Sequence, residues 1–164
     1  SVRISCFSWC TWCLGGEIVL GFPLFDDQTL VRLVSDAKDV GIKIAFLLMV
    51  GFPGETRESV VKTASLLSAC RPFSIGVVFP VHHPGTGLDR HARRKGWVLS
   101  DDLSLAHGSA PVLATPAFDA QSMLEGRELL LVHFRAIQDG GAERERESLD
   151  TLIRWAAFES RART

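Results

Sequence analysis

An almost unbroken apolar run, IKIAFLLMV, extends from Ile42 to Val50. It is much shorter than the stretch of about 20 apolar residues that a membrane-spanning helix needs. Strands of a parallel sheet that are covered on both faces read as continuous apolar runs, whereas a half-exposed strand alternates polar and apolar residues. We therefore expect Ile42 to Val50 to form a central strand of a parallel sheet.

The segments around this strand predict alternating helices and strands. Helices are assigned where apolar residues recur at helical spacing behind a capping residue. The expected elements are a strand at Val2–Ile4, a helix at Gln28–Val40 behind Asp26 and Asp27, a helix at Arg57–Ala69 behind Thr56, and a strand at Phe73–Phe79. Short connections between such elements imply right-handed crossovers and a parallel sheet. The expected fold class is therefore α/β.

Composition excludes several classes of function. The 164 residues are 46% hydrophobic and 23% charged, which is ordinary for one globular domain. The formal net charge of −1 gives no overall field that favours a nucleic acid or an anionic membrane. No secretory signal pattern or membrane span is found in the sequence. We therefore expect a cytoplasmic protein without nucleic-acid partners.

Three of the four cysteines lie close together behind the first expected strand. Cys6, Cys10 and Cys13 have the spacing C-x3-C-x2-C. Three thiolates on one loop suit three irons of a 4Fe-4S cluster, and the fourth iron then stays open for a substrate or cofactor. Half of a zinc site, or plain buried thiols, are the alternatives. Cys70, near a helix end, is expected to be a small buried hydrophobic residue instead of a fourth ligand.

The cysteine loop, with Trp12 before its last cysteine, resembles the cluster loop of the radical S-adenosylmethionine (radical SAM) superfamily. Further motifs follow in the same order as in that family, over about residues 36 to 88: GIKI from Gly41, GFPGET from Gly51, and PGTGL from Pro84. The set is similar to the branch that includes cobalamin-binding radical SAM proteins and proteins like the anaerobic Mg-protoporphyrin cyclase.

The resemblance implies a cofactor arrangement and a chemistry. Cys6, Cys10 and Cys13 would ligate a 4Fe-4S cluster whose open iron binds S-adenosylmethionine (SAM). Trp12 would line the SAM pocket, and the turn residues Gly51, Pro53, Gly54 and Glu55 would line its adenosine part. Reductive cleavage of SAM would then start radical chemistry on an unknown small-molecule substrate. A reductant such as a ferredoxin or flavodoxin is implied, and cobalamin only through a separate domain.

Two further motifs each have two interpretations. Gly15, Gly16 and Glu17 match the letters of a SAM-binding motif of the family, but they adjoin Cys13 where the family places a whole helix, so a simple turn is the preferred interpretation. His82 and His83 are adjacent, and adjacent side chains in extended chain point in opposite directions. At most one of them is expected to face a pocket, and an exposed pair is an equal alternative.

The expected core is incomplete. One βα unit takes about 30 residues in an α/β barrel, so the interval between Cys13 and Ile42 has room for one unit where the family places several. We expect a partial parallel (β/α) barrel of the radical SAM type over residues 1–98, a linker or packed loop over 99–118, and a helical extension over 119–164. Its helices are expected from Asp119 to about Asp139 and from about Glu143.

These observations predict a radical SAM iron-sulfur protein with no assigned catalytic side chain. The alternative is a non-catalytic metal-binding remnant or fragment of such an enzyme that holds zinc or an iron-sulfur cluster. A barrel that lacks strands leaves an open sheet edge, so a partner chain that covers this edge is also expected.

Overall fold

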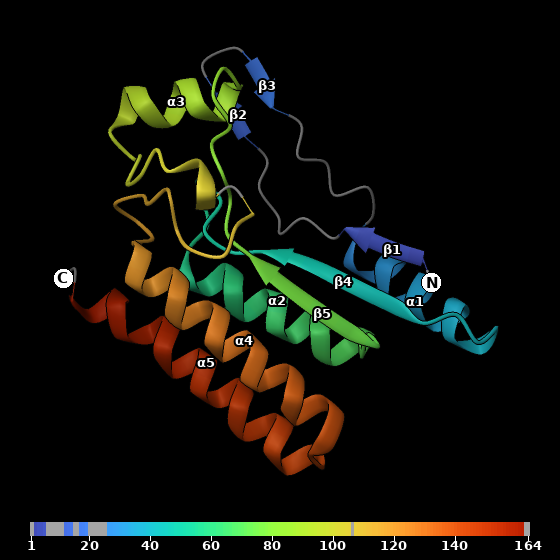
Figure 1. Cartoon of the computed structure of the whole chain (residues 1–164). Helices are drawn as coiled ribbons and strands as arrows, with labels where there is room; N and C mark the ends of the chain where they lie inside the picture. Colours follow the sequence, from blue (N-terminus) through green and yellow to red (C-terminus); the bar gives the residue numbers. More distant parts are fainter. Residues whose placement is uncertain (1, 6–11, 15–16, 20–25, 106, 163–164) are drawn as a thin grey trace.

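The computed structural model describes residues 2–5, 12–14, 17–19, 26–105 and 107–162. Its main sheet has three parallel strands in the order β1–β4–β5, and β2 and β3 form a separate antiparallel pair (Figure 1). The strands are β1 (Val2–Ser5), β2 (Trp12–Leu14), β3 (Glu17–Val19), β4 (Ile44–Met49) and β5 (Ser74–Val78). The prediction of a central parallel strand within the apolar run is therefore confirmed by β4.

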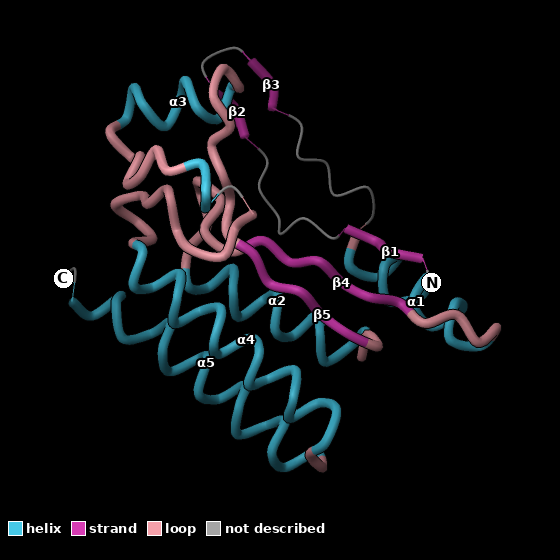
Figure 2. Tube along the Cα trace, in the orientation of Figure 1, coloured by secondary structure: helices cyan, strands magenta, loops and turns pink. Residues whose placement is uncertain are grey.

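Helices make up most of the regular structure in the described part of the chain (Figure 2). They are α1 (Asp27–Asp39), α2 (Arg57–Cys70), α3 (Gly87–Lys95), a 3-10 turn (Leu103–Leu105), α4 (Ala120–Asp139) and α5 (Ala142–Ala162). The helices α1, α2 and α4 pack on one side of the sheet, and α5 lies against α2 and α4. Among the described helices, none combines the length and the apolar character that crossing a membrane requires.

Capping residues explain where three of these helices begin. Asp26 accepts a hydrogen bond from the amide of Thr29 at 2.7 Å, and Asp119 accepts one from the amide of Ser122 at 2.7 Å. At the start of α2, the hydroxyl of Ser59 accepts from the amide of Thr56. Each cap pairs an amide that the first helical turn leaves without a partner. The predicted helix starts are thus confirmed to within one or two residues.

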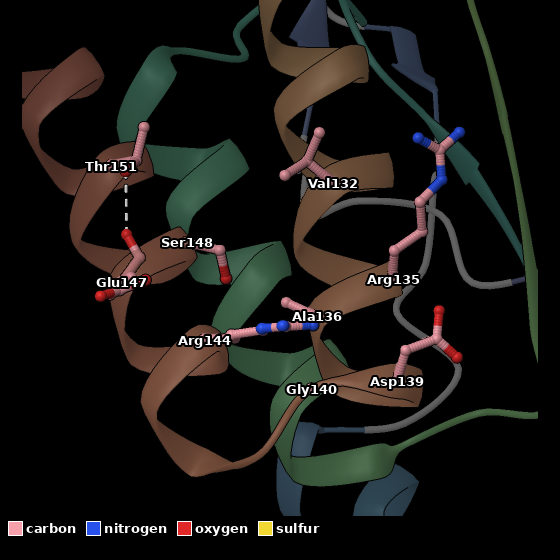
Figure 3. A pocket seen from close by; sticks show the side chains of 9 residues that line it. All are labelled: Val132, Arg135, Ala136, Asp139, Gly140, Arg144, Glu147, Ser148 and Thr151. Atoms are coloured by element: carbon pink, nitrogen blue, oxygen red, sulfur yellow. Dashed lines mark hydrogen bonds between the residues drawn. The ribbon is translucent and has the colours of Figure 1, made fainter.

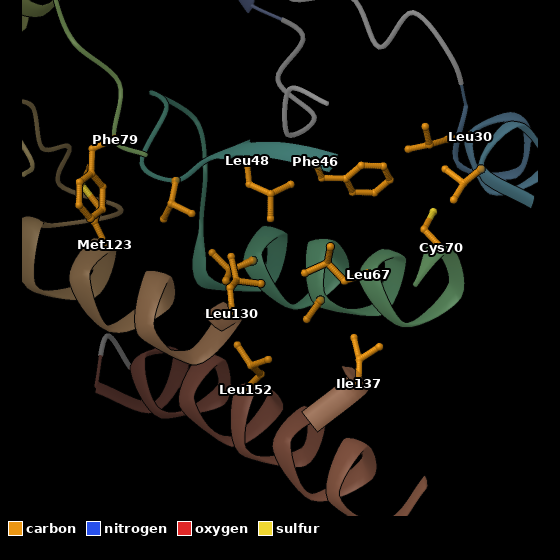
Figure 4. Packing of buried hydrophobic residues seen from close by; sticks show 14 of the residues in the cluster. Leu30, Phe46, Leu48, Leu67, Cys70, Phe79, Met123, Leu130, Ile137 and Leu152 are labelled. Atoms are coloured by element: carbon orange, nitrogen blue, oxygen red, sulfur yellow. The ribbon is translucent and has the colours of Figure 1, made fainter. Parts of the chain in front are cut away.

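The core lies between the sheet and the helices, as Figure 4 shows. On β4, Ile44, Phe46 and Leu48 are buried against α1 and α2, while Leu47 between them is 48% exposed. Burying an aliphatic or aromatic side chain of this size stabilises the fold by about 1.5–3 kcal/mol. The prediction that this strand is covered on both faces is wrong, because α1, α2 and α4 all pack on one side of the sheet and Leu47 on the other side is half exposed.

The expected partial (β/α) barrel is also wrong. The structure has a small open sheet covered by helices on one face, and its C-terminal residues 120–162 form two long helices where further βα units would be needed. A closed barrel requires enough tilted strands to bring the first and last together, about eight in the smallest filled barrels. Three short strands cannot curve that far, so the sheet stays open and its helices form a second and third layer.

Polar contacts bind the two C-terminal helices to α2. Arg57 donates to Ser122 Oγ at 2.8 Å and stacks over the Trp155 ring at 4.7 Å from its centroid. The indole of Trp155 donates to Glu125 at 2.8 Å. His133 on α4 is fully buried, donates from Nε2 to the Ala64 carbonyl of α2 at 3.1 Å, and lies 2.7 Å from the Ser148 hydroxyl of α5. The extension therefore packs as part of the main core.

The segment between α3 and α4 is packed instead of being an exposed linker. Val112 and Leu113 are buried in a second, smaller apolar cluster with Ala92 of α3. Isolated bridges join Val98 to Leu113 and Thr115 to Phe118. Of the two alternatives expected for this segment, the loop packed across the core is the one observed.

Candidate functional site

The carboxyl ends of the parallel strands meet at one edge of the sheet. Ser5, the last residue of β1, lies opposite Leu47 of β4, which in turn lies opposite Gly76 of β5. The strand that precedes Cys6 in the sequence therefore ends beside the strand that precedes the GFPGET turn. This edge is where ligands bind in open parallel sheets and in α/β barrels, and in Figure 1 the three arrowheads point to the same side.

The predicted cysteine ligands fall largely outside what the structure describes. Cys6 and Cys10 lie outside the described residues, as does the side chain of Trp12. Cys13 is part of β2, where its backbone pairs with Ile18 of β3. Among the described side chains, no group of three or more histidines, cysteines, aspartates or glutamates is placed to hold a metal ion. The cluster site therefore stays a prediction from the sequence.

The turn after β4 is organised by a buried carboxylate. Glu55 is 1% exposed, and its Oε2 accepts hydrogen bonds from the amides of Gly51 at 2.5 Å and Phe52 at 3.1 Å. The Glu55 amide in turn donates to the Phe52 carbonyl at 2.9 Å. Hydrogen bonds to a charged acceptor are about twice as strong as neutral ones. Glu55 therefore holds the backbone of the turn in one shape, a role that its carboxylate can fill only by facing inward.

Gly51 packs closely against the side chain of Met123 on α4. Its φ is +98°, and a Cβ built on it would lie 1.8 Å from Cε of Met123 on α4. Pro53 is also buried, while Gly54 is exposed with a φ of +93°. Of the four predicted adenosine-contacting residues, three thus have little surface, and any ligand at this turn would meet Gly54 and backbone groups.

A second polar cluster lies on the loop after β5. His82 is 5% exposed, with Nδ1 at 3.1 Å from Asp89 Oδ1 and Nε2 at 2.9 Å from the Ser100 carbonyl. Asp89 Oδ2 also accepts from the amide of Gly85 at 3.1 Å. His83 is exposed, so the two adjacent histidines do point apart as predicted, but the exposed-pair alternative is wrong for His82.

Arg93 links the two acidic residues of this cluster. It donates from Nε to Asp89 at 2.8 Å and is also paired with Asp101. The Gly85 amide, together with His82 and Arg93, lowers the pKa of Asp89, so this carboxyl is ionised at neutral pH. Both ring nitrogens of His82 lie within hydrogen-bond distance of oxygen atoms, those of Asp89 and of the Ser100 carbonyl. The cluster therefore connects three parts of the chain: the loop at His82, the helix α3 and the segment at Ser100 and Asp101.

The helix α3 ends at Gly96, whose φ is +67°. Glu17 lies in β3, opposite Leu14 of β2, so the two strands that flank Gly15 and Gly16 run antiparallel. Gly15 and Gly16 themselves lie outside the described residues, so the interpretation of the motif as a turn stays a prediction.

Two surface grooves lie away from the carboxyl edge. One of about 400 Å³ is formed between α4 and α5, and its lining includes Arg135 and Asp139 of α4 and Arg144 and Glu147 of α5 (Figure 3). The other, of about 490 Å³, lies at the opposite edge of the sheet beside Phe73. Neither groove contains a residue that the sequence predicts as a ligand, so neither changes the location of the candidate site.

Sequence patterns indicated the GFPGET turn but missed how its parts contact one another. The contacts of Glu55 with the turn amides and of Gly51 with Met123 join residues whose spacing carries no periodic signal. His82 and Asp89 are seven residues apart across a loop and a helix start, and the PGTGLD sequence was the available signal for a tight connection there. Comparison of the sequence with protein-family models and with curated proteins gives no match.

Proposed function

We propose that this protein binds a 4Fe-4S cluster through Cys6, Cys10 and Cys13 and uses it, with SAM, to start radical chemistry on a small molecule. The observation that carries the proposal is the parallel pairing of β1 with β4. It brings the end of the strand that leads into the cysteine motif to the edge that bears the GFPGET turn. Two motifs that are 38 residues apart from Cys13 to Gly51 in the sequence thereby begin at neighbouring strand ends.

The donor set suits the cluster. Cysteine thiolates are the usual ligands of 4Fe-4S clusters, and three of them leave one iron for an exogenous ligand. When bound there, SAM supplies the reactive carbon radical after reduction by one electron. An external reductant of the ferredoxin or flavodoxin type fits this need, and a reducing cytoplasm would keep the three thiols available.

The described residues would shape the site without reacting. The turn fixed by Glu55 offers the exposed Gly54 and backbone groups to a ligand, and it is held against α4 through Gly51 and Met123. The His82 and Asp89 cluster fixes the neighbouring loop. A rigid wall of this kind orients a bound molecule and keeps water out, which is the protein's share of the work in a cofactor enzyme.

The test is anaerobic reconstitution of the purified chain with iron and sulfide, followed by electron paramagnetic resonance of the reduced sample with and without SAM. We expect a 4Fe-4S signal that changes when SAM is added. Cys10→Ala should lose the cluster. Cys70→Ala is the matched control, because it removes a buried thiol that lies in the apolar core at the end of α2; it should keep the cluster.

Metal analysis of the same samples separates the alternatives. Zinc in stoichiometric amount without sulfide would favour a non-catalytic zinc site at the same cysteines. A cluster that forms but does not respond to SAM would leave an iron-sulfur protein without the proposed chemistry. A full cluster in Cys10→Ala would refute the ligand assignment itself.

A further inference from the structure

The outer edge of β5 is open in the described part of the structure. β5 is the last strand in the order β1–β4–β5, so only one of its sides is paired. The Val50 amide donates to the Val78 carbonyl at 2.9 Å, so the backbone groups of Val78 point toward β4, and successive residues of a parallel ladder alternate in direction. Ser74 and Gly76 share the direction of Val78, and the amides and carbonyls of Ile75 and Val77 therefore point away from β4. Beyond the strand, the Phe79 amide bonds to Gly108, which covers only the carboxyl end.

The sequence of this edge carries no protection against pairing. Natural edge strands are usually blunted by lysines, prolines, bulges or a covering loop. β5 reads SIGVV, with no charge and no proline. Beside it on the open face, Leu47 is 48% exposed and lies 3.2 Å from the position of a Cβ on Gly76. The unpaired backbone groups of such a strand can form hydrogen bonds with a strand of another chain.

An apolar stripe on α4 runs along the same edge. At the start of α4, Arg127 lies over the Phe79 ring at 5.2 Å from its centroid, and near its end Gln138 donates to the Pro72 carbonyl at 2.8 Å. The helix therefore runs antiparallel to β5 and contacts it. Leu131 and Phe134 lie between these contacts on the same helical face, since positions three and four apart share a face.

Both residues of the stripe are available for a contact. Leu131 and Phe134 are partly exposed, and neither belongs to the main apolar core or to the residues packed against it. The face that they share with Arg127 and Gln138 is thus the side of α4 that flanks β5. An open strand edge and a partly exposed apolar stripe lie next to each other on one surface.

We propose that two copies of this chain associate through this surface, with the β5 strands paired antiparallel about a two-fold axis near Gly76. The pairing would give a continuous six-stranded sheet and would place the two α4 stripes against each other. In a two-fold dimer, both copies use the same surface patch for the contact. The patch must therefore be complementary to itself. The uncharged β5 edge meets that requirement, because its outward amides and carbonyls pair with the same groups of the other copy. The inference does not depend on the proposed cofactor.

The test is the molar mass of the purified chain, by light scattering on a sizing column and by sedimentation equilibrium, over a range of concentrations. We expect the wild type to have twice the 18.0 kDa of one chain. Leu131→Glu and Phe134→Glu should weaken the dimer at least about tenfold, because each places a charge in an apolar contact. Val132→Glu is the matched control: it is on the same helix and 49% exposed, but it lines the groove toward α5.

Hydrogen exchange of the backbone amides supplies an independent readout. In the wild type, the outward amides of Ile75 and Val77 should exchange more slowly as the concentration rises, and this protection should be lost in Phe134→Glu. Circular dichroism would show that each variant keeps its helices. A wild-type monomer at all concentrations, or a dimer in which these two amides exchange freely, would overturn the proposal.

Discussion

Substitution of Gly51 by alanine tests whether the turn at the candidate site is as closely packed as the structure indicates. Gly51 has a φ of +98°, which side chains rarely adopt, and the added Cβ would lie 1.8 Å from Met123 Cε and 2.7 Å from its Sδ. The left-handed backbone costs an ordinary residue about 1–2 kcal/mol. Overpacking of a filled site costs about 1–3 kcal/mol more. Gly51→Ala should therefore destabilise the protein by about 2–5 kcal/mol.

Gly41→Ala separates the two contributions. Gly41 also has a positive φ, of +77°, but no atom lies within 4 Å of the position of its Cβ. This variant should lose only the backbone contribution, about 1–2 kcal/mol. The difference between the two variants then measures the contact with Met123. In a Met123→Ala background that difference should disappear, because the crowding atoms are gone.

Urea denaturation, followed by circular dichroism and tryptophan fluorescence, gives the free energies of unfolding for this set. If Gly51→Ala were no less stable than Gly41→Ala, the turn would have room beside α4, and the close packing deduced for the site would be incorrect. The same would hold if the Met123→Ala background left the cost of Gly51→Ala unchanged.

Substitutions at three further residues test single interactions. Glu55→Gln should cost about 1 kcal/mol, because a neutral oxygen replaces the carboxylate that accepts two turn amides, and Glu55→Ala should cost more, since both amides lose their partner; urea denaturation measures both. Burial lowers the pKa of His133, so below pH 6.5 the unfolded chain binds a proton that the folded chain resists, and stability should fall as pH drops. His133→Gln should flatten part of this dependence in melts between pH 5 and 8. The contribution of His91, whose pKa is also lowered by burial, should remain. Asp119→Ala should lower the stability by about 0.5–2 kcal/mol through loss of the α4 cap, whereas Asp119→Asn should keep most of it.

The local elements could be predicted from sequence because their causes are local. Helix starts follow from capping side chains such as Asp26 and Asp119, which bond to amides three residues ahead. The strand β4 follows from an apolar run bounded by a glycine turn. Such signals need no knowledge of the rest of the chain, and the structure confirms each of them to within about two residues.

The layer arrangement could not be predicted in the same way. The residues of β4 are apolar on both faces, so their hydrophobicity does not reveal that Leu47 is left half exposed. The exposure of Leu47 depends on which face of the sheet the helices cover. Here α4 packs on the same face as α1 and α2, and α5 packs on α2 and α4. Resemblance to a barrel family supplied the wrong global arrangement, because too few strands are present to close a barrel.

The candidate site was predictable only as a set of motifs. The sequence located the turn at Gly51–Glu55, but it suggested that Glu55 faces a ligand, whereas the carboxylate turns inward to the backbone. The contact of His82 with Asp89 was missed because it depends on how a loop folds back on a helix start. Interactions of this kind appear only after the tertiary structure has placed the groups.

The two proposals concern different boundaries of one sheet, and this separation makes each a control for the other. The cofactor site would lie where the strands end, beside the turn at Gly51, whereas the dimer contact would lie along the outer side of β5 and the stripe of α4. Phe134→Glu should therefore give a monomer that still assembles its cluster, and Cys10→Ala should give a dimer that has lost it. If a single change removed both properties, the sheet itself would have been disturbed, and neither result could be attributed to a local contact. Two separate losses would show that the open sheet supports an independent site at its carboxyl edge and an independent contact along its side.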